Sequence, residues 1–394
     1  MSLTNVSHNI HFFKITSVLQ WFYVPIGVWV LIWRSHFSWE QIALINSIGL
    51  FLQLALELPT GALADLWGRK NTILLGRVFG VVGFALMTIA TDFWLFVLGN
   101  ALYLANWAFE SGSIDALLYD SMKENGIGEE EYQKVQADTF FYCTIGMAIS
   151  SIVGGYLYTL NPQFPYGFTT LVALGALLTA IPLQEPALDS EKFSLKTYLR
   201  QNWEGTLHIF RHSRVAAISF FSIAINFVAY VGLWYLYEPR LAEAGFPASW
   251  LGYLVAGTYL IRALGTKLIP FIMRLSDRTI PIFLAVFQML SSALSFIDNK
   301  FGAVSSVYLR KMSDGMRNPI LSRLENVELE SRYRATSLSA ISLFGNILIA
   351  GAGPAVGYLN AHYSVSFTLG LSAFLGLFLV LPSALYLSRE LRSH

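Results

Sequence analysis

Long apolar runs separated by short polar breaks recur along the whole chain. A bilayer core of about 30 Å needs about 20 apolar residues in a helix, and on that scale the pattern predicts twelve membrane-spanning helices with short connections. The predicted spans are residues 11–33, 41–64, 72–91, 93–119, 135–159, 166–184, 214–238, 249–273, 280–297, 302–324, 335–359 and 365–388. The sequence therefore predicts an all-α integral membrane protein embedded in a lipid bilayer.

One polar segment, residues 185–213, divides the spans into two sets of six. Apolar residues recur in it every four positions from Leu195 to Leu207, which predicts an amphipathic helix at the membrane surface. We therefore predict an N-terminal six-helix bundle over residues 1–184, a cytoplasmic linker, and a C-terminal six-helix bundle over residues 214–394.

Composition agrees with the hydropathy pattern and excludes several classes of protein. Of 394 residues, 55% are hydrophobic and only 13% are charged, and the net charge is +1. That balance leaves no basic surplus for binding nucleic acid. The single cysteine, Cys143, excludes an internal disulfide and a cysteine-rich metal cluster, so we expect neither a metal nor a cofactor.

The distribution of lysine and arginine predicts the orientation in the membrane. If the N-terminus is cytoplasmic, the inner loops hold thirteen of these residues and the outer loops hold three, namely Arg34, Arg240 and Lys300. Because cytoplasmic loops are enriched in positive charge, we expect both termini in the cytoplasm. Compact loops are typical of a bacterial or archaeal inner-membrane protein.

The two halves of the chain share a weak internal echo. The fifth span carries GMAISSIVGGY and the eleventh carries IAGAGPAVGY, which contains Gly353, Pro354 and Gly357, at an offset of 203 residues. Two pseudo-symmetric six-helix halves around a central cavity are a common transporter plan. Small residues also let helices pack closely in lipid, so duplication and simple helix packing both stay open.

The stretch ELPTGALADLWGRKNTI joins the second and third spans on the cytoplasmic side. Gly61 and Gly68 permit a tight turn and close backbone approach, and Asp65, Arg69 and Lys70 place charges at a helix junction. In length, span number and this motif, the chain resembles the major facilitator superfamily. The alternative is a solvated inner loop with ordinary positive-inside charges.

The resemblance implies that this loop is a cytoplasmic gate, in which Asp65 stabilises one state of the transport cycle. Three features depart from the family pattern. Leu66 replaces a basic residue of the motif, Ser150 and Ser151 stand where the fifth span of antiporters has Gly-Pro, and the fourth span lacks the arginine motif of many proton-coupled drug exporters.

The tenth span, residues 302–324, carries Arg310, Lys311, Asp314 and Arg317. Arg310 and Lys311 lie about 13–15 Å into the span, where a lipid-facing charge costs at least a few kcal/mol. The resemblance implies that this span lines the central cavity, where charges are hydrated. Arg317 and Asp314 are spaced to pair along the helix.

The fourth span carries the opposite charge, with Glu110 and Asp115 in its inner half. In one interpretation the bases of the tenth span attract an anionic substrate, while Glu110 or Asp115 binds and releases a proton. In the other, charge pairs between the fourth and tenth spans hold the two halves together. Both interpretations stay open. Asn226 and Tyr230 of the seventh span are candidate cavity-lining groups, with helix packing as the alternative.

The sequence contains no phosphate-binding loop, zinc-protease motif, nucleophile elbow or dinucleotide fingerprint, so we do not expect an enzyme. We predict a monomeric secondary active transporter for a small organic solute, working by alternating access. Because titratable acids are present, we predict proton coupling, with export of an amphiphilic or anionic compound favoured. The alternatives are an importer of a small anionic metabolite and a transporter-like fold acting as a membrane receptor or platform.

Overall fold

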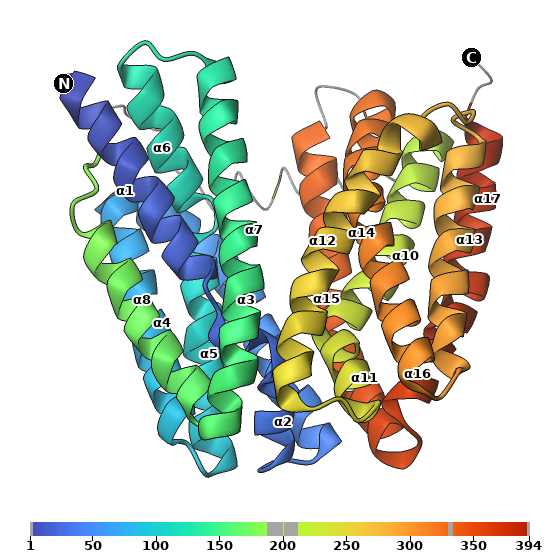
Figure 1. Cartoon of the computed structure of the whole chain (residues 1–394). Helices are drawn as coiled ribbons and strands as arrows, with labels where there is room; N and C mark the ends of the chain where they lie inside the picture. The colour runs from blue at the N-terminus through green and yellow to red at the C-terminus, as the bar shows by residue number, and fades with distance from the viewer. Residues whose placement is uncertain (1–2, 187–199, 201–211, 330–333, 392–394) are drawn as a thin grey trace. The chain divides into compact units, whose positions relative to one another are not determined.

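The computed structural model describes residues 3–186, 200, 212–329 and 334–391, and every regular element in these ranges is helical (Figure 1). The elements before the linker are α1 (Leu3–Trp21), η1 (Val24–Gly27), α2 (Trp29–Arg34), α3 (Trp39–Trp67), α4 (Arg69–Ile89), α5 (Phe93–Glu110), α6 (Ser113–Glu124), α7 (Glu129–Leu160) and α8 (Phe164–Ala180). Those after it are α10 (Ser213–Tyr235), α11 (Tyr237–Glu243), α12 (Ala248–Ile272), α13 (Thr279–Ala293), η2 (Leu294–Phe296), α14 (Lys300–Glu328), α15 (Arg334–His362), α16 (Val365–Leu375), η3 (Gly376–Val380) and α17 (Leu381–Glu390).

Eight helices among the described residues are long and apolar enough to cross a membrane. They are Trp39–Glu57, Arg69–Ile89, Glu129–Leu160, Ser213–Tyr235, Ala248–Ile272, Thr279–Phe296, Ser337–His362 and Val365–Glu390. Two further predicted spans form helices that miss the criteria, since Phe164–Ala180 is short and residues 302–324 carry five charged side chains. The total of twelve spans therefore stays a prediction.

Two predicted spans were wrong as single helices. In the range 11–33, α1 ends at Trp21 and a short 3-10 helix containing Pro25 precedes α2. Proline has no backbone N–H to donate, which explains the interruption there. In the range 93–119, α5 ends at Glu110 and α6 begins after Gly112, whose φ of 77° suits glycine and terminates the helix.

The chain divides into two compact units. The first comprises Met1–Phe37, Ile45–Leu195 and Ala248–Ala256, and the second comprises Ser38–Leu44, Lys196–Pro247 and Gly257–His394. The predicted bundle boundaries at residues 184 and 214 stay predictions. The amphipathic helix expected between Leu195 and Leu207 lies outside the described residues except at Arg200.

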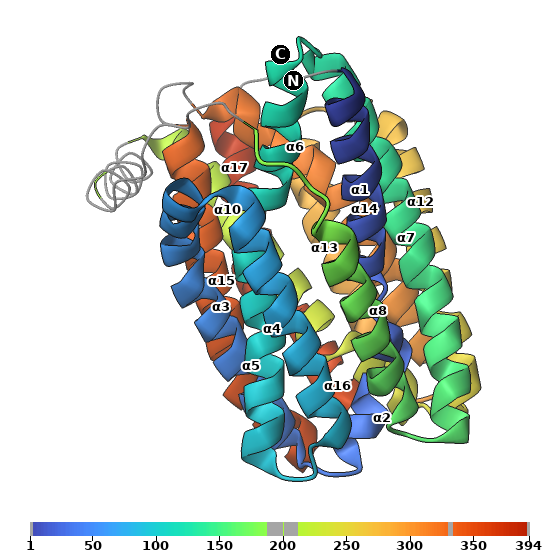
Figure 2. The ribbon, with the colours of Figure 1, turned by 90° about the vertical axis from the view of Figure 1, so that its left-hand side faces the viewer.

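In the first unit, α4, α5 and α8 lie side by side (Figure 2). A second set of contacts joins α1, α6 and the start of α7 through a buried apolar cluster. Its largest members include Phe13, Ile73, Leu117, Leu118 and Met122. This packing holds the start of α4, which carries Arg69 and Lys70 of the predicted gate.

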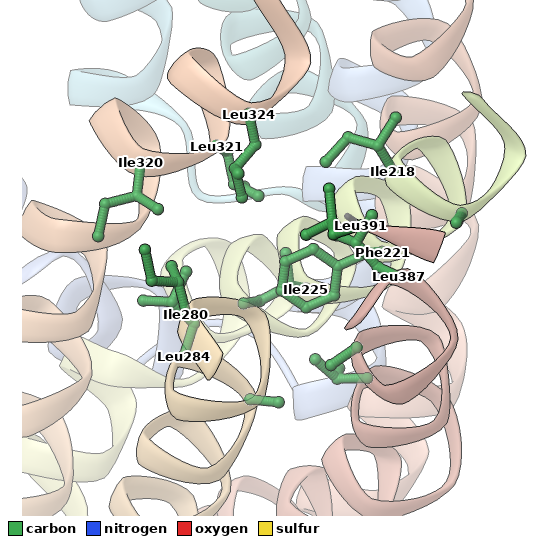
Figure 3. Packing of buried hydrophobic residues seen from close by; sticks show 14 of the residues in the cluster. Ile218, Phe221, Ile225, Ile280, Leu284, Ile320, Leu321, Leu324, Leu387 and Leu391 are labelled. Carbon is green, nitrogen blue, oxygen red and sulfur yellow. The ribbon is translucent and has the colours of Figure 1, made fainter. Parts of the chain in front are cut away.

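In the second unit, α10, α13, α14 and α17 share one apolar core (Figure 3). Phe221 and Ile225 of α10 pack with Leu284 of α13, Leu324 of α14 and Leu387 of α17. All these side chains are 3% exposed or less. The core holds α14 in place along one face, so its charged residues are positioned by packing and not by lipid.

The outer surface of the helices is apolar. On α8 and just beyond it, Leu171, Leu174, Leu178 and Ile181 are 42–66% exposed and recur at helical spacing along one stripe. A soluble monomer rarely exposes contiguous apolar surface of this kind, whereas a helix facing lipid does.

Candidate functional site

The predicted gate motif lies where α3 ends and α4 begins. Gly68 has φ 96°, a value that favours glycine, and it lies between Trp67 of α3 and Arg69 of α4. A Cβ built on Gly68 would lie 3.3 Å from the carboxylate of Glu185. Both the turn and the close approach of Glu185 therefore depend on glycine at this position.

The Glu185 carboxylate caps the N-terminus of α4. Its two oxygens accept hydrogen bonds from the backbone N–H of Arg69 at 2.8 Å and of Lys70 at 2.7 Å. These are two of the backbone donors that a helix start leaves unpaired, and a carboxylate also suits the positive end of the helix dipole. The sequence prediction missed Glu185, whose only signal was an acid just after the sixth apolar run.

The side chain of Arg69 forms an ion pair with Asp120 of α6, another residue that the sequence prediction missed. Asp65 is partly buried on the last turns of α3. Gly61 differs from the expectation of close backbone approach, because a Cβ there would meet nothing within 4 Å among the described residues. The loop is thus a network of charged contacts around one required glycine.

Glu110, the last residue of α5, is 6% exposed and pairs with Arg77 of α4. The distance from Arg77 Nη2 to Glu110 Oε1 is 2.6 Å, and Arg77 is only 1% exposed. One interpretation of the sequence paired the fourth span with bases of the tenth, but the structure pairs Glu110 with the third predicted span. Arg77 was visible in the sequence as a lone arginine in an apolar run.

Asp115, the second candidate acid of this region, has a different environment. It lies exposed on the first turn of α6 and accepts a hydrogen bond from Gln136 of α7 at 2.8 Å. The two acids are therefore separated by burial as well as by the break between α5 and α6.

The guanidinium of Arg310 on α14 is surrounded by neutral partners. Its Nε donates to the Tyr237 hydroxyl at 3.1 Å, Nη2 donates to the carbonyl oxygen of Val228 at 2.7 Å, and Nη1 donates to Ser292. Arg310 is 1% exposed and also lies over the ring of Tyr237. Each of its three nitrogens thus has a protein partner.

Lys311, the next residue, is 8% exposed and is held differently. Its ammonium lies 5.2 Å from the centroid of the Tyr237 ring and interacts electrostatically with the buried Glu238. Among the described residues, it has no hydrogen-bond acceptor and no carboxylate within ion-pair distance. Tyr237 and Glu238 begin α11 and were not singled out from the sequence.

Lower on α14, Arg317 Nη1 lies 2.6 Å from Asp314 Oδ1, one turn away. The Arg317 guanidinium also lies over the ring of Tyr230 at 5.5 Å, so Tyr230 contacts a charged side chain. Asn226, one turn earlier on α10, is partly buried, and its Oδ1 has no hydrogen-bond donor among the described residues.

The glycine-rich stretches of the two halves make close helix contacts. A Cβ on Gly357 of α15 would lie 2.7 Å from the Cβ of Ala43 on α3, and Gly353 is buried one turn earlier, beside Pro354 within the helix. In the first unit, Ser151 of α7 donates to the carbonyl oxygen of Gly252 at 3.0 Å. Both stretches therefore pack against the first turns of another helix.

Comparison with known proteins relates most of the chain to one family. The model of the Major Facilitator Superfamily matches residues 14–354. An uncharacterised MFS-type transporter, YxaM of Bacillus subtilis, is 23% identical over 372 residues, covering 91% of this chain and 90% of that protein. The multidrug resistance protein MdtH of Photorhabdus laumondii is 23% identical over 337 residues, covering 81% of this chain and 79% of MdtH.

Solved structures share the architecture at low sequence identity. The crystal structure of a D-xylose–proton symporter superposes with a TM-score of 0.75, is 12% identical, and covers 97% of each chain. At that identity the likeness concerns the fold alone.

Proposed function

Because this chain belongs to the major facilitator superfamily, a family of multi-pass membrane transporters for small molecules, we propose that it is a proton-coupled secondary active transporter. It moves a small organic solute across the cytoplasmic membrane of a bacterium by alternating access. We propose export of an amphiphilic or anionic compound as its direction of transport.

The contrast between Arg310 and Lys311 carries this proposal. The nitrogens of Arg310 are engaged by Tyr237, Ser292 and Val228, which leaves that guanidinium a structural role. The ammonium of Lys311 has only an aromatic face and an electrostatic interaction with Glu238. A buried cation without hydrogen-bond acceptors gains most from an anionic ligand, so Lys311 binds the acidic group of the solute.

The pair formed by Arg77 and Glu110 supports proton coupling. It supplies a titratable carboxyl group deep in the first unit, where taking up a proton changes the net charge of a buried pair. A coupling ion acts by changing the relative free energies of two conformations, and a buried charge pair is sensitive to such a change.

The relatives support export and keep import as a second candidate. MdtH is a multidrug resistance protein, whereas the symporter of similar fold carries D-xylose together with protons. Import of a small anionic metabolite would use the same contact with Lys311. A receptor or assembly platform would bind a ligand without moving it.

Binding is tested by a thermal-shift screen of the purified protein against a library of anionic, neutral and cationic metabolites and drugs. A ligand present at 100 times its dissociation constant adds about 2.7 kcal/mol to the free energy of unfolding. We expect anions among the stabilising compounds and no stabilisation by them in the Lys311→Gln variant. Stabilisation by cations alone, or an unchanged response in Lys311→Gln, would refute the assignment of Lys311.

Transport is tested with the same compounds in proteoliposomes carrying a pH gradient. Accumulation that reverses with the gradient supports proton coupling, and its direction separates export from import. A compound that binds but never moves would favour the receptor.

Solvent access at Lys311 is tested by thiol labelling in a Cys143→Ser background. A single cysteine at position 311 should react with a membrane-impermeant reagent, and a stabilising anion should protect it. Ser306, which is fully buried on the same helix and donates to the carbonyl oxygen of Ala303, is the matched control position. If positions 306 and 311 are equally unreactive in all conditions, Lys311 does not meet a solute.

A further inference from the structure

A polar cluster is buried between α4 and α5 of the first unit. Arg77 of α4 is 1% exposed, and Asn106 and Glu110 of α5 are 0% and 6% exposed. The two helices pack closely here, because a Cβ on Gly76 or Gly80 would lie within 3.5 Å of the Asn106 side chain. Figure 2 shows α4 and α5 side by side along their length.

Most polar atoms of this cluster have no partner. Apart from the bond between Arg77 Nη2 and Glu110 Oε1, Arg77 Nε and Nη1 lack acceptors among the described residues. Both side-chain amide atoms of Asn106 and Oε2 of Glu110 likewise have no hydrogen-bond partner among the described residues. Buried polar groups of folded proteins are almost always hydrogen-bonded, so five such atoms together need a ligand.

The set of unpaired atoms defines the chemistry of that ligand. Arg77 and the amide nitrogen of Asn106 are hydrogen-bond donors, whereas the amide oxygen of Asn106 and Oε2 of Glu110 are acceptors. A ligand that fits both must donate and accept hydrogen bonds, as an ordered water molecule does.

We propose that Arg77, Asn106 and Glu110 form a hydrated proton-binding site, in which Oε2 of Glu110 takes up the proton that drives the transport proposed above. A hydronium ion transfers its proton to Oε2, leaving a neutral water molecule and a neutral carboxylic acid. The cluster then changes from a neutral pair to a net charge of +1 on Arg77. Two further titratable groups interact electrostatically with Glu110, namely Asp115 of α6 and Cys143 of α7.

Arg310 provides an internal comparison for this inference. It is as deeply buried as Arg77, but neutral protein groups occupy all three of its nitrogens and no carboxylate is paired with it. Each nitrogen of Arg310 thus has a neutral protein partner, whereas Arg77 has one partner among the described residues, a carboxylate that a proton can neutralise.

The site is tested by infrared spectroscopy of the full-length protein in lipid nanodiscs at acidic and alkaline pH. In the difference spectrum between acidic and alkaline pH, we expect one component of the carboxylic-acid carbonyl band to be lost in Glu110→Gln and to remain in Asp115→Asn. A band that persists unchanged in Glu110→Gln, or no such band in the wild type, would overturn the proposal. If Glu110→Gln does not fold, Arg77→Lys keeps the carboxyl group and must shift the band, and an unshifted band would be equally decisive.

Hydration is tested on the same band after transfer to D2O. A carboxyl group that reaches bulk water through bound water molecules shows its isotope shift within the mixing time. A shift that needs unfolding of the protein would show that the cluster is dry and would refute the hydrated site.

Transport assays separate this site from the general proposal. If solute accumulation follows the pH gradient but Glu110→Gln stays coupled, the site is wrong and proton coupling stands. If Glu110 titrates but solute movement ignores the gradient, the proton-binding site stands and the coupling proposed for it is wrong.

Discussion

Replacing Arg310 by methionine tests whether a buried side chain whose nitrogen atoms all have hydrogen-bond partners stabilises the fold. Charged side chains without such partners would instead bind a solute or a proton. The substitution keeps most of the side-chain volume and removes three donors, which leaves the Tyr237 hydroxyl, the Ser292 hydroxyl and the Val228 carbonyl without their cation. Both hydroxyls already donate elsewhere, Tyr237 to the carbonyl oxygen of Ala229 and Ser292 to that of Gln288. Neither can therefore replace Arg310 by donating to the freed Val228 carbonyl without losing a bond.

The size of the effect follows from these three bonds. A side-chain hydrogen bond in a membrane protein contributes about 0.6 kcal/mol on average, which gives about 2 kcal/mol as a lower value. Each buried group left without a partner costs about 1–3 kcal/mol, partly offset because a buried charge no longer needs to be desolvated. We expect Arg310→Met to lower the free energy of unfolding by about 2–5 kcal/mol.

The matched control is Lys311→Met, one residue away on the same helix. Lys311→Met removes no hydrogen bond among the described residues; it removes the contact with the Tyr237 ring, which contributes about 0.5–2 kcal/mol, and the electrostatic interaction with Glu238. Unfolding of both variants is measured by titration with a denaturing detergent in mixed micelles, followed by tryptophan fluorescence, and solute binding is measured in parallel. If Lys311→Met lowers the free energy of unfolding as much as Arg310→Met does, or if Arg310→Met leaves it unchanged, then the number of hydrogen bonds that a buried cation makes does not identify the one that stabilises the fold.

Three other predictions concern the side of the protein that we predict to be cytoplasmic. Asp65→Asn should impair transport while the protein still folds and inserts, and normal transport kinetics would exclude a gating role. Glu185→Gln should weaken the cap of α4 by about 1 kcal/mol, so that the backbone amides of Arg69 and Lys70 exchange hydrogen roughly fivefold faster, and unchanged exchange would show that the carboxylate is dispensable. Reporter fusions at residue 394 and within residues 185–213 should both report the cytoplasm, and a periplasmic signal at either place would overturn the orientation.

The helices were predictable because each needs about 20 apolar residues, and that requirement is visible in any single segment. The breaks were not predictable from proline alone. Pro59, Pro270 and Pro319 lie inside intact helices, whereas Pro25 lies in an interruption. Neighbouring helices can satisfy the groups that a proline frees, and the sequence does not say which prolines have such neighbours.

The ion pair between Arg77 and Glu110 could not be predicted from the sequence, for a geometric reason. Arg77 lies twelve residues before the end of α4, and Glu110 lies seventeen residues after the start of α5. If the two helices are antiparallel and straight, this difference of five residues separates the two backbone positions by about 7.5 Å along the helix axes. The long side chains of Arg77 and Glu110 bridge that distance, and their direction is not encoded in the spacing of apolar positions.

The turn of the predicted gate motif was the most predictable part of the candidate site, because Gly68 favours a turn at this position. Its partners were not predictable, because Glu185 and Asp120 come from segments more than 50 residues away along the chain. The identity of a motif thus located the loop, while the contacts that hold it depend on how α4, α6 and the end of the sixth span meet.

Three acidic residues differ in whether both of their carboxylate oxygens accept a hydrogen bond. Glu185 gives both oxygens to the backbone N–H groups at the start of α4, and Glu243 gives both to those of Val365 and Ser366 at the start of α16. Each of these two carboxylates therefore uses both oxygens to cap the start of a helix. Glu110 has one oxygen on Arg77, and among the residues that the structure describes the other oxygen has no partner, so Glu110 can gain a proton without breaking a helix cap. If proton coupling instead followed substitution of Glu185 or Glu243 and ignored Glu110, the free oxygen would not be the feature that selects the coupling residue.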